Sequence, residues 1–232
     1  MADEERNLEK CFEKHPFEEL NDLDVYSIAA ALQYVFKRLS ISKETLPQVA
    51  FLDVGCNAGS FVKVLQKMGV TTNIHCFEPH PVLSKKTKSV YPHITMNQCC
   101  LSNNTDDIVL NIPTWSVGLS SMIDRPVFSR LSSEGQVINR VTVQSRMVDE
   151  YLETNNIKYV YFMKIDVEGG EKMVLEGAKK SLQQKRILSG MFEVGETLKD
   201  ANTSEREICE ILEGCGYKVN KTQLRNDYVF HI

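Results

Sequence analysis

The sequence lacks the features that mark secreted proteins, membrane proteins and cysteine-ligated metal centres. Its seven cysteines include no C-x-x-C pair, so we expect neither a structural zinc site nor a disulfide framework. No stretch approaches the roughly 20 apolar residues that span a bilayer. The chain begins Met-Ala-Asp-Glu-Glu-Arg, which is acidic and lacks the apolar segment of a signal peptide. These absences predict a cytoplasmic protein without a membrane partner.

The chain also lacks an excess of positive charge. Its formal net charge is −4 and its isoelectric point is about 5.8, whereas domains that bind nucleic-acid phosphates are normally basic. We therefore expect no nucleic-acid partner. With 42% apolar and 25% charged residues, the composition is typical of a soluble globular protein, and 232 residues fit one large domain.

A glycine that dinucleotide-binding proteins need is missing from the most informative stretch, residues 51–61, Phe-Leu-Asp-Val-Gly-Cys-Asn-Ala-Gly-Ser-Phe. The apolar residues 49–54 predict a strand buried on both faces, and apolar residues at helical spacing follow the loop. The dinucleotide pattern G-x-G-x-x-G has glycine where this chain has Asn57. The spacing Gly55-x-x-x-Gly59 instead suits a nucleoside that carries no phosphate.

Acidic residues stand at the ends of several predicted strands, namely Asp53, Glu78, Asp166 and Glu193. Because the carboxyl ends of parallel strands meet at one edge of a sheet, where α/β proteins bind ligands, these side chains are expected to lie near one another. Asp53 is placed to accept hydrogen bonds from a cationic or hydroxyl-bearing ligand. Glu78 is placed to accept both hydroxyls of a ribose.

Apolar periodicity predicts an α/β sheet flanked by helices. The expected strands cover residues 49–54, 73–78, 94–101, 108–112, 140–144, 159–165, 187–192, 217–221 and 228–232. The expected helices cover residues 22–39, 147–155, 174–182 and 204–213, and two more begin near residues 60 and 81. Residues 113–136 are predicted as a long irregular loop over the active site. We expect an N-terminal helical extension, 1–45, and a catalytic domain, 46–232.

Several segments resemble the S-adenosylmethionine-dependent methyltransferases. Phe51-Leu-Asp-Val-Gly-Cys-Asn-Ala-Gly-Ser is similar to their motif I, and Cys76-Phe-Glu-Pro-His-Pro to their ribose-binding motif. Three further segments resemble the FkbM methyltransferase family specifically: Gly118-Leu-Ser-Ser, Val141-Thr-Val-Gln-Ser-Arg-Met-Val-Asp-Glu-Tyr and Lys164-Ile-Asp-Val-Glu-Gly-Gly-Glu. The similarity runs from about Ala50 to Phe192. At residues 99–102 the chain reads Cys-Cys-Leu-Ser, whereas the family usually has a sequence similar to Ala-Leu-Ser-Asp.

The resemblance implies a Rossmann-like, seven-stranded methyltransferase sheet that is mostly parallel, with its last strand antiparallel and helices on both faces. It implies S-adenosylmethionine as cofactor, with the adenine ring near Cys100 and Leu101. The cofactor-binding residues expected on this basis are Asp53, Gly55, Asn57, Gly59, Phe61, Glu78, Pro79, Cys100, Leu101, Ser120 and Asp166.

A hydroxyl acceptor needs its proton removed, by a positioned base or by a metal that lowers its pKa. The expected catalytic residues are Asp166, as the leading candidate for the base, with Glu193 and Lys164. If Asp166 and Glu193 lie on adjacent strands, they could also hold Mg²⁺ or Mn²⁺, because the hard oxygen ligands there do not suit zinc. The alternative is that one carboxylate caps the backbone and the other pairs with Lys164.

Other candidate residues have simpler interpretations. Cys99 and Cys100 point to opposite faces of a strand and are expected to pack rather than bind a metal. His80 is expected to be an exposed loop residue rather than a ligand contact. Glu171 is expected to be structural at a helix start, while Glu168 is left open between a structural and a functional role.

The combined expectation is an S-adenosylmethionine-dependent O-methyltransferase that acts on a hydroxyl of a sugar, glycan or polyketide-like small molecule. Two alternatives stay open at this point. One is an N- or carboxyl-directed methyltransferase on the same fold, because the fold does not fix the acceptor. The other is a non-catalytic nucleoside-binding domain.

Overall fold

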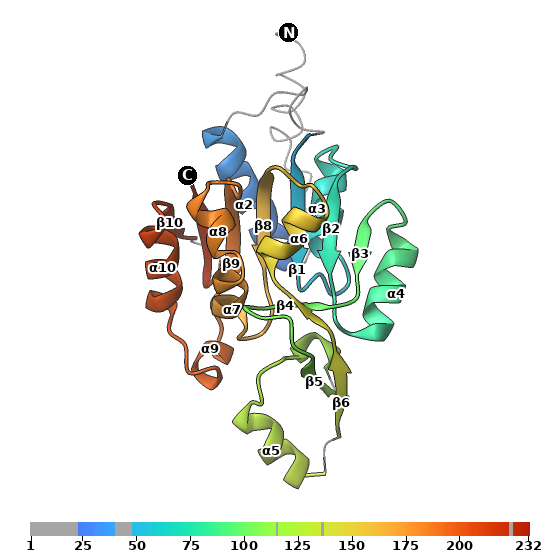
Figure 1. Ribbon diagram of the computed structural model, residues 1–232. Helices are drawn as coiled ribbons and strands as arrows, with labels where there is room; N and C mark the ends of the chain where they lie inside the picture. Colours follow the sequence, from blue (N-terminus) through green and yellow to red (C-terminus); the bar gives the residue numbers. More distant parts are fainter. Residues whose placement is uncertain (1–22, 40–47, 115, 136, 223–224) are drawn as a thin grey trace.

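In the computed structural model, a seven-stranded sheet forms the centre of the molecule (Figure 1). The structure describes residues 23–39, 48–114, 116–135, 137–222 and 225–232. The strands lie in the order β10-β11-β9-β8-β1-β2-β3, and β11 is antiparallel to both of its neighbours. Their bounds are β1 Ala50–Val54, β2 Ile74–Phe77, β3 Thr95–Asn97, β8 Val160–Ile165, β9 Ser189–Glu193, β10 Lys218–Lys221 and β11 Asp227–His231. The predicted fold class, including the antiparallel last strand, is confirmed.

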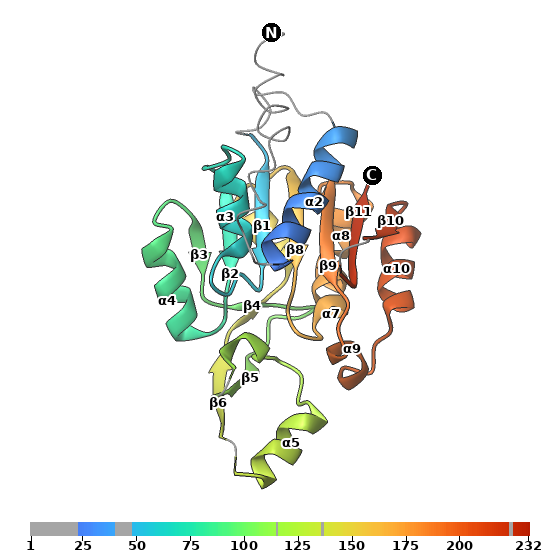
Figure 2. The same ribbon diagram turned by 180° about the vertical axis from the view of Figure 1, so that it is seen from behind.

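Helices cover both faces of the sheet, as Figures 1 and 2 show from opposite sides. One face carries α6 (Val148–Thr154), α7 (Glu171–Glu176), α8 (Lys179–Gln183) and α10 (Glu205–Gly214). The other carries α2 (Leu23–Arg38) and α3 (Ser60–Lys67). Two further helices lie outside the lobe: α4 (Pro81–Val90) is beside the edge strand β3 (Figure 1), and α9 (Thr197–Asp200) follows β9 in the chain.

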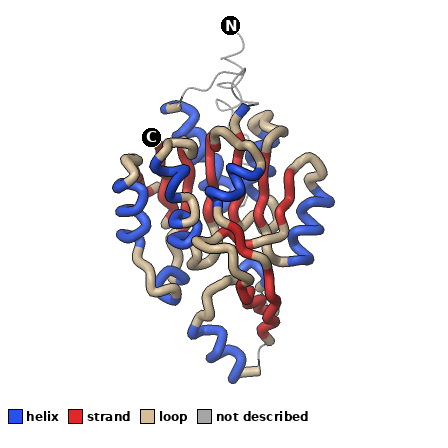
Figure 3. The backbone as a smooth tube through the Cα atoms, viewed as in Figure 1, coloured by secondary structure: helices blue, strands red, loops and turns tan. Residues whose placement is uncertain are grey.

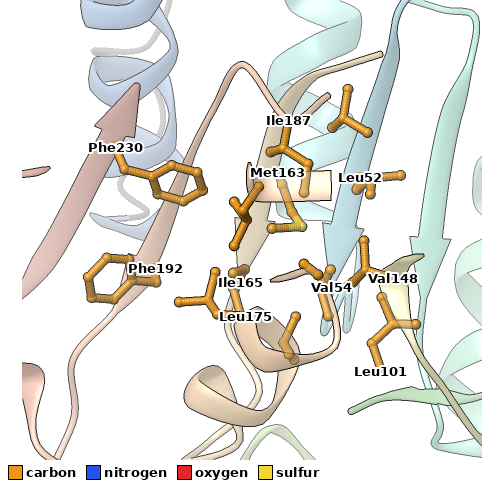
Figure 4. Close-up of a cluster of buried hydrophobic side chains, with 14 of the residues drawn as sticks. Leu52, Val54, Leu101, Val148, Met163, Ile165, Leu175, Ile187, Phe192 and Phe230 are labelled. Atoms are coloured by element: carbon orange, nitrogen blue, oxygen red, sulfur yellow. The ribbon is translucent and has the colours of Figure 1, made fainter. Parts of the chain in front are cut away.

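Alternation along β1 divides the core into two layers. Leu52 and Val54 pack with Met163 and Ile165 of β8 in one cluster (Figure 4), whereas Phe51 packs in the second cluster beneath α2 and α3. This is the period-two pattern of a strand that is buried on both faces. It fixes the register of the central strands, and therefore the positions at which their carboxyl ends stop.

The helix predicted over residues 22–39 is present as α2, and its apolar stripe is part of the main core. Val25, Ile28, Leu32 and Val35 are each at most 2% exposed and belong to the same cluster as Phe51. The predicted boundary between residues 45 and 46 lies outside the described residues, within 40–47. A division there separates two parts of one hydrophobic core.

Residues 102–114, 116–135 and 137–146 form a lobe that projects beyond the carboxyl edge of the sheet, at the lower end of Figures 1 and 3. Its elements are β5 (Ile108–Pro113), the 3₁₀ turn η2 (Val117–Leu119), α5 (Pro126–Ser133), β6 (Ile138–Val143) and β7 (Ser145–Arg146). β5 and β6 form an antiparallel hairpin. The prediction of a wholly irregular loop over residues 113–136 is wrong, because the polar stretch contains α5 with Pro126 at its start.

Two predicted elements are each divided in the structure. The strand expected over residues 94–101 separates into β3 and β4 (Cys100–Leu101), because β4 turns away from the sheet and pairs with β7 instead. The helix expected over residues 174–182 separates into α7 and α8 at Gly177. A Cβ atom at Gly177 would lie 2.0 Å from the Ser102 carbonyl oxygen, so the backbones meet at this break.

The other predicted strands and helices are present to within a few residues at each end, whereas β7 and α9 were not predicted. Ser204 begins α10 with a capping box, since its hydroxyl accepts from the Glu207 backbone amide while Glu207 accepts from the Ser204 amide. Among the described helices, none combines the length and the apolar composition needed to cross a membrane.

Candidate active site

A cavity of about 300 Å³ opens at the carboxyl edge of β1, β2, β8 and β9, beneath the lobe. This volume is at the lower end of the range for small-molecule sites. The predicted site residues in its wall are Gly55, Asn57, Glu78, Pro79, Cys100, Leu101, Ser120, Asp166 and Glu193. Most of the predicted site residues therefore border one cavity, whereas three predicted cofactor contacts and Lys164 do not.

The loop after β1 requires glycine at Gly55 for two reasons. Its φ is +78°, in the left-handed region that favours glycine. A Cβ atom there would also lie 1.9 Å from the Asp166 carbonyl oxygen. Because the Asp166 amide donates to the Val54 carbonyl oxygen at 3.0 Å, the loops that follow β1 and β8 are held in direct contact, and together they form the floor of the cavity.

Glu78 is fixed by backbone donors from two segments. Its Oε2 accepts from the Asn57 amide at 2.8 Å and its Oε1 accepts from the His80 amide at 2.9 Å. The residue is 5% exposed, and burial raises the pKa of its carboxyl group. Each oxygen retains a lone pair for a further donor, so the carboxylate can accept two hydroxyl groups from the cavity side.

His80 is not the exposed loop residue that was expected. It is 8% exposed, and its Nδ1 accepts from the amides of Val82 and Leu83 at 3.1 and 3.3 Å. Its imidazole therefore caps the start of α4.

Cys99 and Cys100 pack on opposite sides of the chain, as predicted. Cys99 belongs, with Leu101, to the same core cluster as Leu52 and Val54. Cys100 packs with Leu110 and Ile112 of the lobe. Both cysteines also border the cavity, where they give an apolar wall suited to a flat heterocycle.

Three predicted cofactor contacts, Asp53, Gly59 and Phe61, do not line the cavity. Phe61 faces the core and stacks on Phe162 with a centroid separation of 5.8 Å, because the first turn of α3 packs on the sheet. Gly59 has φ +85° and precedes α3, and a Cβ atom there would lie 2.6 Å from the Tyr91 ring. Asp53 lies beneath the floor and is 0% exposed.

Lys164 links Asp53 to the cavity floor. Its Nζ lies 3.0 Å from Asp166 Oδ2 and 3.7 Å from Asp53 Oδ1. Burial opposes the charged form, but the carboxylates of Asp166 and Asp53 outweigh it and raise the pKa of Lys164. Lys164 does not line the main cavity and lies within ion-pair distance of Asp166, while its catalytic role stays a prediction.

Glu193 lies at the end of β9 and pairs with a residue that the sequence analysis did not identify. Arg225, between β10 and β11, donates to Glu193 Oε1 at 2.8 Å and also pairs with Asp24 of α2. Both partners border the cavity. Burial and the nearby Asp166 carboxylate raise the pKa of Glu193 to about 7, although Arg225 opposes the shift.

The segment that follows Asp166 forms a tight turn beside the cavity. Glu168 borders the cavity and has φ +53°, which is uncommon for a residue other than glycine. Burial and Asp166 raise the pKa of its carboxyl group to about 7. Glu171 instead turns inward and accepts from the amides of Val167 and Gly169, which agrees with its expected structural role.

The lobe closes the cavity opposite the glycine loop. Gly118, Ser120 and Met122 are in the cavity wall, so the segment Gly118-Leu-Ser-Ser does lie over the site. Met122 also contacts Gly170, where an added Cβ atom would be 3.1 Å from its methyl carbon. Trp115, which the sequence analysis placed in the same loop, is outside the described residues.

Comparison with known proteins identifies the family to which this geometry belongs. The family model described as "Methyltransferase FkbM domain" matches residues 53–219. The chain belongs to the FkbM methyltransferase family. The glycine loop, Glu78 and the turn after Asp166, which all contribute to the cavity wall, lie within the matched segment. The predicted family and the predicted methyltransferase activity are thereby confirmed.

Two curated relatives and one solved structure illustrate the similarity. The chain is 26% identical over 180 residues to Methyltransferase 1 of Beauveria bassiana (strain ARSEF 2860), which covers 68% of this chain and 72% of that protein. It is 23% identical over 154 residues to the 2-O-methyltransferase NoeI of Sinorhizobium fredii (strain NBRC 101917 / NGR234), covering 61% and 62%. A crystal structure of a methyltransferase FkbM from Methylobacillus flagellatus KT has 14% identity and a TM-score of 0.51, covering 86% of this chain and 48% of that one. This chain thus spans about half of that solved relative.

Potential metal ligands in this FkbM methyltransferase gather beneath the cavity rather than in it. Among the described residues, ligand atoms of Asp53, Cys56 and Cys76 lie within 4.8 Å of one another. A hydrogen bond to Cys76 and burial raise the pKa of the Cys56 thiol, so the thiolate that a metal needs is disfavoured. Asp166 and Glu193, the predicted magnesium or manganese ligands, are each engaged by a cationic side chain.

Sequence reasoning missed Arg225, Asp24 and Arg125. None of them belongs to a local motif, and each reaches the site from an element distant in sequence. Arg125, at the start of α5, lies 4.0 Å from the Glu168 carboxylate. Their positions near the site could be predicted only if it were known which loops meet at the carboxyl edge of the sheet.

Proposed function

We propose that this FkbM methyltransferase uses S-adenosylmethionine to methylate a hydroxyl group of a sugar, glycan or polyketide-like small molecule. The observation that carries the proposal is that Asp166, Glu168 and Glu193 border the same cavity as the glycine loop and Glu78. One relative of this chain is named as a 2-O-methyltransferase, which supports an oxygen acceptor.

The residues in the cavity wall fit the proposed cofactor. Glu78 presents a buried carboxylate whose oxygens are already oriented by two backbone amides, and this arrangement suits the two adjacent hydroxyls of a ribose. Pro79, Cys100 and Leu101 supply apolar surface beside it, which suits adenine. When bound, S-adenosylmethionine supplies an activated methyl group.

The protein's own contribution is to align the acceptor, exclude water and accept a proton. The lobe contributes Gly118, Ser120 and Met122 to the cavity wall, so acceptor and donor can be held in one orientation, which supplies much of the rate of such a transfer. The carboxylates at the ends of β8 and β9 can accept hydrogen bonds from acceptor hydroxyls. One of them can then remove the hydroxyl proton.

The cavity disfavours one alternative reaction, methylation of a carboxylate. Asp24, Asp166, Glu168 and Glu193 all border it, against one lining cation, Arg225, among the described residues. A negatively charged acceptor would therefore be repelled. Amine acceptors and a non-catalytic nucleoside-binding role are outcomes that the experiment below distinguishes.

The proposal is tested by incubating the protein with S-adenosylmethionine and a panel of neutral methyl glycosides, uronates, amines and polyketide alcohols. A mass increase of one methylene on a neutral hydroxyl compound is the expected result. Transfer to amines or carboxylates alone would establish the alternative acceptors. Cofactor binding without transfer to any compound would establish the non-catalytic role.

Glu78 provides the matched test of the cofactor site. We expect Glu78→Ala to weaken S-adenosylmethionine binding by about tenfold to a hundredfold, because ribose hydroxyls and two backbone amides lose their acceptor. Calorimetry measures the affinity directly. Glu196→Ala, at an exposed position outside the cavity wall, is the control, and unchanged affinity in Glu78→Ala would remove Glu78 from the site.

We further propose that the protein works in the cytoplasm on a small-molecule or glycan acceptor. The cysteines of the described residues are all free thiols, which is the usual state in a reducing compartment. Localisation of the tagged protein to a secretory compartment would contradict this proposal.

A further inference from the structure

The carboxylates that border the cavity differ in how firmly they are already engaged. Asp166 lies 3.0 Å from Lys164 Nζ, and Glu193 accepts from Arg225 at 2.8 Å. Asp24 pairs with the same arginine. Glu168 has its nearest cationic atom, Arg125 Nη1, at 4.0 Å. A close ion pair occupies lone pairs, so Asp166 and Glu193 retain fewer of them for an acceptor hydroxyl than Glu168 does.

Arg125 is committed to another partner. Its Nε donates to Asp200 Oδ2 at 2.9 Å, which draws the guanidinium away from Glu168. Within residues 23–39, 48–114, 116–135, 137–222 and 225–232, no hydrogen bond reaches the Glu168 carboxylate. Its side chain is 25% exposed and it borders the cavity, so both oxygens are available to a bound acceptor.

The backbone holds Glu168 in this position at some conformational cost. Its φ of +53° lies in the left-handed region, which is unfavourable for a residue with a side chain. The turn is nevertheless fixed, because Ser121 Oγ donates to the Glu168 carbonyl oxygen at 2.7 Å and the Glu171 carboxylate accepts from the next amide, that of Gly169. Such conformations persist where the surroundings enforce them, and they are concentrated at functional sites.

We propose that Glu168, rather than Asp166, is the general base of the methyl transfer. This inference rests on the proposed function, since it requires a hydroxyl acceptor. The acceptor proton moves to a Glu168 oxygen while the hydroxyl oxygen bonds to the methyl carbon. The electron pair of the broken carbon–sulfur bond remains on sulfur, which loses its positive charge, and Glu168 later releases the proton to solvent. Asp166, held by Lys164, orients the acceptor.

The charged surroundings of Glu168 suit a base that works near neutral pH. Burial and Asp166 raise the pKa of Glu168 to about 7, and Arg125 opposes the shift without cancelling it. A base whose pKa lies near the working pH is the most effective. The titratable and charged groups that face it are Asp166, Glu171, Arg125, Glu193 and Arg225.

Two variants separate this role from folding. Glu168→Gln keeps the shape of the side chain and removes the base. Glu168→Gly also removes the base, and glycine adopts the left-handed backbone without strain, so this variant is expected to fold. Glu213→Gln, on the exposed surface of α10, is the matched control.

The first measurement needs no acceptor or cofactor. Infrared spectra of the protein across the pH range record the protonated carboxyl band, and the difference between wild type and Glu168→Gln isolates Glu168. We expect a carboxyl group that titrates near pH 7. A difference band that titrates near the ordinary value for glutamate, or no band above pH 5, would overturn the proposal.

The second measurement uses S-adenosylmethionine and a neutral methyl glycoside that the wild type methylates. We expect Glu168→Gln and Glu168→Gly to turn over about a hundredfold to ten-thousandfold more slowly, with cofactor affinity changed less than about twofold. Turnover of the wild type should fall tenfold per pH unit below about pH 7, and the variants should lose this pH dependence. Added formate should partly restore the turnover of Glu168→Gly. Native turnover in Glu168→Gln would overturn the proposal. If the wild type methylates no glycoside, the sugar acceptor is rejected, and the infrared titration alone decides the assignment of Glu168.

Discussion

Asp53 belongs to the motif that is predicted to bind the cofactor, but it does not line the cavity. It is 0% exposed, and neither carboxylate oxygen has a hydrogen-bond partner among the described residues. Lys164 Nζ, at 3.7 Å, is the cation that compensates it. A sequence motif fixes where a residue lies along a strand. The partner of its side chain depends on the neighbouring strand, which here supplies Lys164.

The buried carboxyl of Asp53 gives a pH prediction. Burial raises the pKa of Asp53 to about 6 from an ordinary value of 3.8, although Lys164 opposes the shift. Since the folded state binds this proton more tightly, the stability that it contributes is present below about pH 4 and is lost as the pH rises to about 6. The loss amounts to about 3 kcal/mol. Urea unfolding of wild type and Asp53→Asn should therefore give a free-energy difference that changes by this amount between pH 4 and pH 7, and a difference independent of pH would contradict the prediction.

Lys164 gives a second prediction at the residue scale. Lys164→Met leaves Asp53 buried without its cation, and breaking a buried ion pair in this way costs about 3–5 kcal/mol. Lys172→Met is the matched control, because Lys172 pairs with Glu207 at 2.7 Å in a more exposed setting, 29% and 43% exposed. The control should lose about 0–1 kcal/mol. Urea unfolding measures the loss of stability in each variant. Equal losses would show that the buried Lys164 ion pair contributes no more to stability than the more exposed Lys172 pair.

At the scale of elements, the sequence predicted well wherever apolar periodicity alone decides the structure. β1, β8 and β9 and the helices α2, α6 and α10 lie where the patterns place them. The failures occur where a tertiary contact overrides the pattern. At Gly177 the helix is interrupted because the Ser102 backbone occupies the space beside it, and at Cys100 the strand leaves the sheet because β7 offers a partner. Neither contact can be read from a local window of sequence.

The glycines allow the cost of a close approach to be separated from the cost of a backbone conformation. Gly55 and Gly69 have nearly the same φ, +78° and +79°, but a Cβ atom at Gly69 would meet nothing within 4 Å. Gly69→Ala should cost about 1–2 kcal/mol for the left-handed backbone. Gly55→Ala should cost about 1–3 kcal/mol more, because the Asp166 carbonyl oxygen must move. Urea unfolding measures the loss of stability in both variants. Similar losses would mean that the Asp166 backbone moves away from an added Cβ atom at little cost in free energy.

Arg125 of the lobe forms an ion pair with Asp200 of α9. This contact gives a prediction about opening of the lobe. Arg125→Ala removes the charge-assisted bond to Asp200, worth about 2 kcal/mol. Amide hydrogen exchange over residues 116–122 should consequently become at least about tenfold faster, while exchange in β1 and β8 stays unchanged. Arg130→Ala, on the exposed side of the same helix, is the control. Exchange in residues 116–122 that is equally fast in both variants would contradict the prediction.

At the scale of the whole molecule, the sequence located the site because the topology of a parallel sheet brings strand ends together. Glu78, Asp166 and Glu193 come from three strands and meet at one cavity, as expected. Arg225 and Asp24 could not be found in this way, because each approaches from a segment whose placement depends on the antiparallel strand β11 and on the packing of α2. The parallel core of the fold was therefore predictable, and the residues that complete its edge were not.

The pairing of β4 with β7 has a consequence for how this enzyme could acquire new acceptors. The chain leaves the sheet for the lobe at Cys100–Leu101 and returns at Ser145–Arg146, and these two short strands are hydrogen-bonded neighbours. A segment whose ends lie side by side can be exchanged or lengthened without moving the framework that carries it. Gly55, Asn57, Glu78 and Asp166 border the cavity from outside this segment, whereas Gly118, Ser120 and Met122 border it from within. We therefore expect that replacing residues 102–144 between relatives would change the covering wall of the cavity and leave the wall formed by the sheet edge unchanged.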